Sequence, residues 1–393
     1  LNVVLAEDTE LLEEVVVVGY GTTKKENLTG AVSVVSSDAI SNRSRSNLGQ
    51  ILQGAVPGMT VTTSSGQPGE GVSLNIRGWN SINSGNPLVL VDGVEGDLSR
   101  VNPNDVESIS VVKDASSAAV YGARASFGVI LVTTKSGASS EEEYATVRYS
   151  GRYGFTTPTA STDWETRGYY SVYYNNLFHE NYNGAQAVTY TEQDMVELWN
   201  RRNDVVENPE RPWVIPDETG TYSYVYLGNF DWYDFIFKSV RPETEHNISV
   251  RGGNDKVKYY VSGRYLYKEG IFDNAAEDIY NSFSLRSKID AKITNWLTYS
   301  NSLSFERMLY DYGGFWELDG TSGIVDAGII WNLTQNVTPA FTPWNPDGTV
   351  NMYPGYMADA TSPIFSGRGG VFTDGRNQNK RTKNYLTMTN RFT

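Results

Sequence analysis

The sequence predicts a mixed α/β globule followed by strands of a transmembrane antiparallel β-barrel. Three observations lead to this fold class. Residues 31–137 contain short apolar runs separated by turn residues, with room for short helices. From Tyr144 onward, longer segments alternate between apolar and polar residues. The connections between those segments alternate between short and long, which is typical of outer-membrane barrels.

The composition excludes several classes of protein. Among 393 residues, 46 are acidic and 32 are basic, and the formal charge of -14 argues against a nucleic-acid partner. Cysteine is absent, so disulfides and thiolate metal sites are excluded. No apolar run is long enough for a membrane-spanning helix. The 26 Tyr, 14 Phe, 9 Trp and 37 Gly residues suit a β-rich chain.

The stretch EEVVVVGYGTTKK, residues 13–25, begins in the way that a dinucleotide-binding unit begins. Four valines predict a strand, and Gly19 and Gly21 follow it. The fingerprint needs a third glycine where Lys24 stands, and no long amphipathic helix follows. Nucleotide binding is therefore not expected. We expect residues 14–30 to be extended, after residues 1–13 that end a preceding domain.

Local patterns predict the elements of residues 31–137. AVSVVSSDAI indicates a strand and then a helix that begins near Ser37, and NLGQILQGAVPGMTV indicates a short helix broken at Pro57. Four more strands are predicted in VSLNIRG, PLVLVDGV, VESISVVKD and FGVILVTTKSG, with a short helix in SSAAVYGARA. Residues 138–143 form a linker.

The segments after Tyr144 have a period of two. In YATVRYSGRYGF, one set of positions reads Ala, Val, Tyr, Gly, Tyr, Phe, and the other is largely polar and charged. The pattern recurs in KVKYYVSGRYLYK, IYNSFSLRSKIDA and WLTYSNSLSFERML, is weaker in TEHNISVRG, and starts again in NYLTMTNRFT. A tilted strand crosses a bilayer in about 9–11 residues. Alternation alone also fits a half-solvated soluble sheet.

The connections favour the membrane alternative. Short turns at 252–255 and 292–295 alternate with long connections at 156–243 and 310–383 and a shorter one at 269–278. Outer-membrane barrels have short turns at one end and long loops at the other. Five strands and part of a sixth cannot close a barrel, and open edges leave backbone groups unpaired in hydrocarbon. We therefore expect further strands, from outside these residues, to complete it.

Four segments between residues 11 and 137 resemble the plug of SusC/RagA-type TonB-dependent transporters of Bacteroidetes, in the expected order. They are LEEVVVVGYGTTKKENLTGAVSVVSS, LGQILQGAVPGMTV, LNIRGWNSINSGNPLVLVDGV and NPNDVESISVVKDASSAAVYGARASFGVILVTTKSG. The resemblance implies that residues 31–137 plug a barrel of about 22 strands, that residues 144–393 are its first five to six strands, and that residues 1–13 end an N-terminal extension domain. The implied TonB box is Glu14, Val15, Val16, Val17, Val18 and Gly19.

The resemblance implies active import of oligomeric nutrients, glycans or peptides, across the bacterial outer membrane, and implies no enzyme activity and no cofactor. TonB, energised with ExbB and ExbD, would pair with the box by β-augmentation, which suits a β-branched segment. A SusD-like surface lipoprotein would cap the extracellular mouth, and outer-membrane lipid would surround the barrel. The aromatic residues of loops 156–243 and 310–383 suit a partner surface or a sugar platform, and simple loop packing explains them equally well.

Candidate ligand contacts on the plug are Trp79, Asn80 and Asn83, in the polar stretch RGWNSINSGN. The acidic residues at Asp92, Glu95 and Asp97 suggest either a metal site or, preferably, a solvated turn. Three alternatives remain open: a siderophore or cobalamin receptor, a surface glycosidase with paired carboxylates, and an adhesion protein. The loop acids that a glycosidase would use lie in no recognisable motif, and they are Asp231, Asp234, Glu317 and Asp319.

Overall fold

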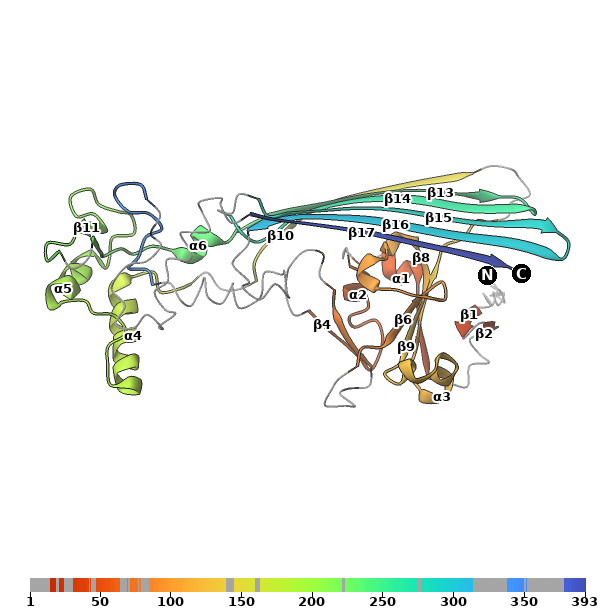
Figure 1. Ribbon diagram of the computed structural model, residues 1–393, viewed down its shortest axis with the longest axis horizontal. Helices are drawn as coiled ribbons and strands as arrows, with labels where there is room; N and C mark the ends of the chain where they lie inside the picture. Colours follow the sequence, from red (N-terminus) through yellow and green to blue (C-terminus); the bar gives the residue numbers. More distant parts are fainter. Residues whose placement is uncertain are drawn as a thin grey trace, which may run out of the picture.

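The computed structural model describes residues 15–18, 21–24, 31–41, 43, 47–63, 69, 71–76, 78, 85–138, 145–159, 163–220, 223–273, 277–313, 338–349, 351 and 378–393. These residues form three parts (Figure 1). A globule of short strands and helices, here called the N-terminal globule, packs beneath a long six-stranded sheet. A lobe of helices and short strands lies beyond one end of that sheet.

The N-terminal globule is built on a five-stranded sheet of order β3-β8-β9-β6-β7. Its strands pair antiparallel except β6 with β9, which are parallel. The strands are β3 (Val32–Ser36), β6 (Leu88–Val91), β7 (Val94–Glu95), β8 (Val106–Val112) and β9 (Val129–Thr134). Hydrophobic side chains pack on both faces of β8 and β9, which explains their continuous apolar sequence.

Short helices close this globule. Helix α1 (Ser37–Ser41) follows β3 directly, as the sequence predicted, and α2 (Leu48–Ile51) buries Leu48 and Ile51. The side chain of Asn47 caps α2 by accepting from the Gly49 amide. Helix α3 (Ala115–Ala118) continues into 3₁₀ turns.

Strand β4 of the globule was not predicted, and neither was β7. The end of the segment read as a broken helix forms β4 (Met59–Thr62), which pairs antiparallel with β5 (Ser73–Ile76). Gly58, with φ of 76°, lies immediately before β4 in a conformation that glycine adopts without strain. The alternating burial of β4 shows that it packs one face on the core.

The long sheet contains β10 (Thr146–Thr156), β13 (Arg241–Gly253), β14 (Val257–Glu269), β15 (Ile279–Thr294), β16 (Leu297–Gly313) and β17 (Gln378–Phe392). All neighbouring strands are antiparallel and follow sequence order. The tight turns after β13 and β15 lie at the end of the sheet opposite the lobe (Figure 1). The predicted segregation of short and long connections is therefore confirmed.

The two faces of this sheet have opposite polarity. Large apolar side chains are exposed on the outer face: Val147, Tyr149, Tyr153, Phe155, Phe283, Leu285, Leu386 and Met388. Polar and charged side chains are buried on the inner face: Glu245, Asn247, Ser262, Arg264, Ser282, Arg286 and Glu306. A half-solvated soluble sheet instead buries its apolar face and exposes its polar face to water. Apolar residues outside and polar residues inside are the arrangement of a membrane barrel wall.

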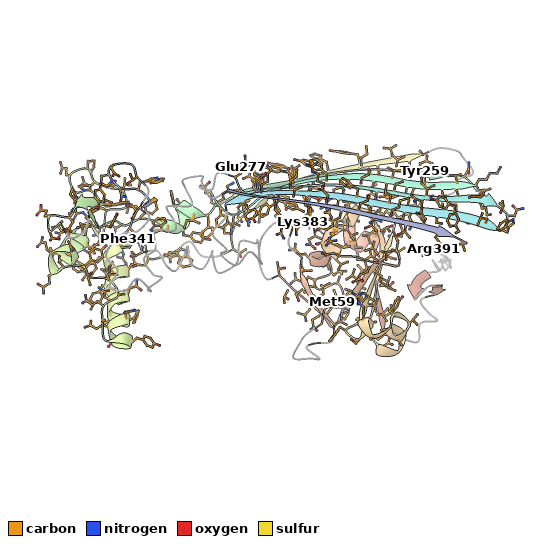
Figure 2. The ribbon with its side chains drawn as sticks, in the orientation of Figure 1. Met59, Tyr259, Glu277, Phe341, Lys383 and Arg391 are labelled. Atoms are coloured by element: carbon orange, nitrogen blue, oxygen red, sulfur yellow. The ribbon has the colours of Figure 1, made fainter. Side chains whose placement is uncertain are left out.

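The connection between β10 and β13 folds into the lobe. It contains α4 (Gly168–Asn183), α5 (Glu192–Arg201), the pair β11 (Val214–Pro216) and β12 (Tyr224–Tyr226), and α6 (Trp232–Ile236). A capping box between Thr191 and Asp194 starts α5. Phe341, from the next long connection, lies inside the lobe and away from Lys383 and Arg391 of β17 (Figure 2).

Among the helices in the described residues, none is both long and apolar enough to cross a bilayer.

Candidate functional site

The valine segment forms a strand of a small hairpin. Strand β1 (Val15–Val18) pairs antiparallel with β2 (Gly21–Lys24), with Val15 opposite Lys24 and Val18 opposite Gly21. Strand β1 also lies next to β8 of the globule. One edge of the valine segment is thus occupied by its own chain. Glu14 and Gly19 lie outside the described residues.

Charged side chains join the N-terminal globule to the inner face of the long sheet. Arg286 of β15 lies 3.5 Å from Asp92 and 3.7 Å from Asp105. Lys288, two residues further along the same face, lies 3.4 Å from Asp92. Tyr260 of β14 donates a 2.9 Å hydrogen bond to Asp105. Two carboxylates of the globule are therefore held by three side chains of the sheet.

Asp92 has an uncommon backbone conformation. It sits directly after β6 with φ of 49°, and among the described residues it is the one non-glycine position with positive φ. The amide and hydroxyl of Thr134 donate to its carboxylate at 3.0 Å and 2.5 Å. These bonds and the cations of β15 fix the Asp92 side chain at the interface.

The structure corrects the interpretation of Asp92, Glu95 and Asp97 as a solvated turn for Asp92 alone, because Glu95 and Asp97 are exposed. Asp92 is largely buried and ion-paired, because the sheet covers it. Glu95 pairs instead with Arg124, whose hydrogen bond holds the pKa of that carboxyl below its usual value. Asp97 accepts from the Ser99 amide and caps a 3₁₀ turn. Within the described part of the chain, no acidic or histidine group has the arrangement of a metal site.

A second set of charges lines the inner face of the sheet itself. Arg264 donates to Glu245 at 2.8 Å, and both side chains are buried. Arg152 donates to Glu245 and to Glu243, each at 2.7 Å. Charges buried in this way are stable because each has an opposite partner. The inner face is therefore a polar lining, as expected of a wall that faces a plug and a passage for polar ligands.

A cation–π contact also joins the globule to the sheet, and a buried lysine lies close to it. The guanidinium of Arg100 lies 3.7 Å from the ring centre of Tyr385 in β17, in a cation–π geometry. Lys135, after β9, donates to the carbonyl of Asn104, and burial lowers the pKa of its ammonium. A cavity of about 70 Å³ between the globule and strands β13 and β14 is lined mainly by polar residues.

The predicted ligand residues Trp79, Asn80 and Asn83 lie outside the described residues. Between Ile76, at the end of β5, and Gly85, the structure describes only Gly78. Of the loop acids, Asp231 caps α6 by accepting from the amides of Tyr233 and Asp234. Glu317 and Asp319 also fall outside the described residues.

Sequence reasoning did not single out Asp105, Tyr260 or Arg286. The alternation of β14 and β15 already placed their charged residues on one face. Because that face turns inward in a barrel, its Arg and Lys residues were identifiable as partners for acids of the plug. Tyr260 shares this face, although its side chain is aromatic.

Comparisons with known proteins agree with this architecture. The family model "TonB-dependent Receptor Plug Domain" matches residues 24–129. TonB-dependent receptor SusC of Bacteroides thetaiotaomicron is 34% identical over 282 residues, which cover 69% of this chain and 24% of that protein. TonB-dependent receptor P26 of Formosa agariphila is 31% identical over 353 residues, which cover 88% of this chain and 30% of that protein.

Among solved structures, the RagAB peptide importer in the "open-open" state matches with a TM-score of 0.65 at 26% identity. The match covers 96% of this chain and 40% of that chain. The chain spans about a quarter of the length of SusC and 30% of the length of P26.

A plug-type globule seated on the polar face of a barrel-type sheet defines a TonB-dependent receptor. These receptors are β-barrel proteins of the bacterial outer membrane, and they are transporters rather than enzymes. Within this family, the chain is most like the SusC/RagA type among the relatives given above.

Proposed function

We propose that this chain serves TonB-dependent active import of oligomeric nutrients, glycans or peptides, as the SusC-like channel beneath a SusD-like lipoprotein lid. The observation that carries the proposal is the polar interface between Asp92, Asp105 and strands β14 and β15. A plug held by hydrogen bonds and ion pairs, rather than by a large apolar core, can be released by force and re-form.

The hairpin of β1 and β2 suits a coupling role. An extended β-branched segment offers backbone donors and acceptors to a sheet edge of a partner. We propose Glu14, Val15, Val16, Val17, Val18 and Gly19 as the TonB-binding segment, with ExbB and ExbD supplying the energy. TonB would either pair along the free edge of β1 or displace β2, and in both cases the pull would pass directly to β3 and β8.

The division of the chain follows the same proposal. Residues 1–13 end an N-terminal extension domain, 14–30 carry the TonB box, and 31–137 are the plug. Residues 138–143 link it to the barrel strands of 144–393, with extracellular loops at 156–243 and 310–383. On the plug, Trp79, Asn80 and Asn83 are proposed to contact the ligand.

We propose that the lobe contacts the SusD-like lipoprotein lid. Helix α4 exposes a row of aromatic side chains, at Tyr173, Tyr174, Phe178 and Tyr182. Exposed aromatic residues are enriched at protein interfaces. A similar solved structure also supports a partner protein at this position, because it is the RagAB peptide importer.

Deleting Val15–Val18 from the full-length protein tests the proposal in the bacterium. We expect oligosaccharide or oligopeptide uptake to fall to background while surface display remains normal. A matched variant with Val16→Ile and Val17→Ile keeps a β-branched segment and should retain uptake. Retained uptake in the deletion would refute energy coupling through this segment. Uptake of a siderophore or cobalamin, without oligomers, would favour that alternative receptor class.

A further inference from the structure

Two exposed cations interrupt the outer face of the barrel wall. Arg307 of β16 lies opposite Phe283 of β15, an exposed apolar residue of that face, and Lys380 of β17 lies nearer the lobe. Both Arg307 and Lys380 are exposed. A cation on the lipid face is unfavourable at the middle of a bilayer and tolerated near its surface. The depth of Arg307 in the membrane therefore decides what its side chain contacts.

One aromatic cluster marks the end of the lipid-facing surface that is remote from the lobe. Tyr299 of β16 packs on Phe392 of β17, with ring centres 5.1 Å apart. Arg307 lies eight residues further along β16 toward the lobe. That separation is about 26 Å along a strand, or about 20 Å across the bilayer for a tilt of about 40°. The apolar band of such barrels is about 25 Å tall, so Arg307 lies near its other boundary.

A second aromatic cluster lies beside Arg307. Phe283, its partner in register, packs on Tyr265 of β14 with ring centres 4.9 Å apart, and the Tyr265 hydroxyl donates to Asn281 at 2.9 Å. Apolar residues on the outer face of β16 and β17 fill the space between the two clusters: Leu303, Phe305, Leu386 and Met388. Aromatic girdles lie at the two surfaces of the membrane. Because the long connections lie at this end, Arg307 faces the headgroups of the extracellular leaflet.

Arg307 has no anionic partner within the described residues. Its neighbours in register, Phe283 and Asn384, are both neutral, and both neighbouring strands are present, so the lateral surroundings of the side chain are complete. Lys380 pairs with Asp311 at 3.1 Å, but 69% of the Lys380 side chain is exposed. The patch formed by Arg307, Lys380, Asp311 and Asn384, here called the headgroup patch, therefore keeps a net positive charge.

We propose that the headgroup patch binds the phosphate of a lipid in the extracellular leaflet. The Arg307 guanidinium can donate two parallel hydrogen bonds to one phosphate, and Asn384, exposed on the next strand, supplies a neutral donor. The flexible stem of Lys380 brings a second cation to the same leaflet. Clustered basic residues at a membrane surface attract anionic headgroups in this way.

The apolar surface next to the headgroup patch indicates a lipid rather than a free phosphate ion. Phe305 and Leu386 are paired in register two residues from Arg307, toward the middle of the membrane, and Leu386 is 69% exposed. Acyl chains joined to the bound phosphate would cover these side chains. Inorganic phosphate has no apolar part to do so.

This site goes beyond the proposed import function, because it lies on the lipid face and needs neither TonB nor a nutrient. Lipid binding to purified protein tests the site alone. Failure to bind lipid leaves energy-coupled import intact, and loss of uptake on deleting Val15–Val18 leaves the lipid site intact.

Native mass spectrometry of the full-length protein in detergent tests the proposal. The probes are monophosphoryl lipid A and the same lipid with its phosphate removed, with inorganic phosphate as a competitor. We expect the phosphorylated lipid to bind about tenfold more tightly than the dephosphorylated one, and Arg307→Gln to remove most of that difference. Lys380→Gln should weaken binding about threefold, and Arg307→Lys should fall between wild type and Arg307→Gln.

Lys256→Gln is the matched control. It removes an exposed cation from the turn between β13 and β14, at the opposite end of the wall, and should stay within about twofold of wild type. Because the substituted side chains are exposed, all variants should keep wild-type heat-modifiable gel migration. Equal affinity for the two lipids, a preference for the phosphorylated lipid that survives Arg307→Gln, or displacement of the bound lipid by inorganic phosphate would overturn the proposal.

Discussion

Tyr260 of the barrel wall donates a 2.9 Å hydrogen bond to Asp105 of the plug, across 155 positions of sequence. Both residues are almost fully buried. Arg286 approaches the other oxygen of the same carboxylate at 3.7 Å. The Asp105 carboxylate therefore finds its polar partners on the barrel wall. These contacts hold the plug in place, and the plug surface that they cover is polar.

Replacing Tyr260 with Phe should loosen the plug without unfolding the wall. The variant loses a hydrogen bond to a charged group, which typically contributes about 1.5–3 kcal/mol. We expect faster hydrogen exchange in the peptide that contains Asp105, measured by mass spectrometry on the full-length protein. Tyr265→Phe is the matched control, because Tyr265 bonds to Asn281 within the wall. Equal exchange in both variants would contradict the anchoring role.

Asp92 should tolerate Asn better than Ala. Asn keeps a side-chain acceptor for Thr134 and tolerates positive φ, but it removes the charge that faces Arg286 and Lys288. Ala also loses the acceptor and strains the backbone at φ of 49°, by about 1–2 kcal/mol. Limited proteolysis of the plug should be slowest in wild type, faster in Asp92→Asn and fastest in Asp92→Ala. An inverted order of the two variants would show that strain at Asp92 is unimportant.

The sequence was most informative where structure depends on local periodicity. The period of two placed Arg264 and Arg286 on one face and Phe283 and Leu285 on the other, and the structure confirms both assignments. Strand β3 followed at once by α1 was also predictable, because a polar cap succeeds an apolar run.

Features that depend on distant contacts could not be predicted. The core of the lobe packs Leu227 with Ala340 and Phe341, which are more than 100 positions further along the chain. Asp92 was read as a solvated turn because its partner Lys288 is 196 positions away. Local composition does not reveal such pairings, so the sequence placed residues 156–243 in one long loop and predicted neither α4 nor the packed core of the lobe.

Truncating the lobe core should unfold the lobe and spare the barrel wall. Leu227 is fully buried in the cluster with Val172 and Leu198. Leu227→Ala leaves a cavity and should cost about 2–5 kcal/mol. Leu177→Ala, on the exposed face of α4, is the matched control and should cost much less. Protease cleavage within residues 163–237, with barrel folding followed by heat-modifiable gel migration, measures both. Simultaneous loss of the barrel would show that lobe and wall fold as one unit.

The lobe should also lose stability in alkaline solution, because Tyr226 must stay neutral. Burial raises the pKa of Tyr226 to about 12, with further contributions from Tyr224 and Asp347, and its hydroxyl donates to Asn345 at 2.8 Å. In the unfolded chain the phenol ionises near pH 10, at about its ordinary pKa. Between these values the unfolded state binds fewer protons than the folded state, so stability falls as pH rises, by at most about 3 kcal/mol.

Tyr226→Phe tests this dependence. The variant loses the bond to Asn345 and should be less stable than wild type near pH 8, by about 1 kcal/mol, but its stability should fall less steeply above pH 10. Protease cleavage of the lobe at pH 8 to 11.5 provides the measurement, and Tyr182→Phe, at an exposed tyrosine of α4, is the control. Because the Tyr182 side chain is exposed and makes no contact in the lobe core, that variant should keep the wild-type slope. An alkaline slope unchanged by Tyr226→Phe would assign the loss to another group.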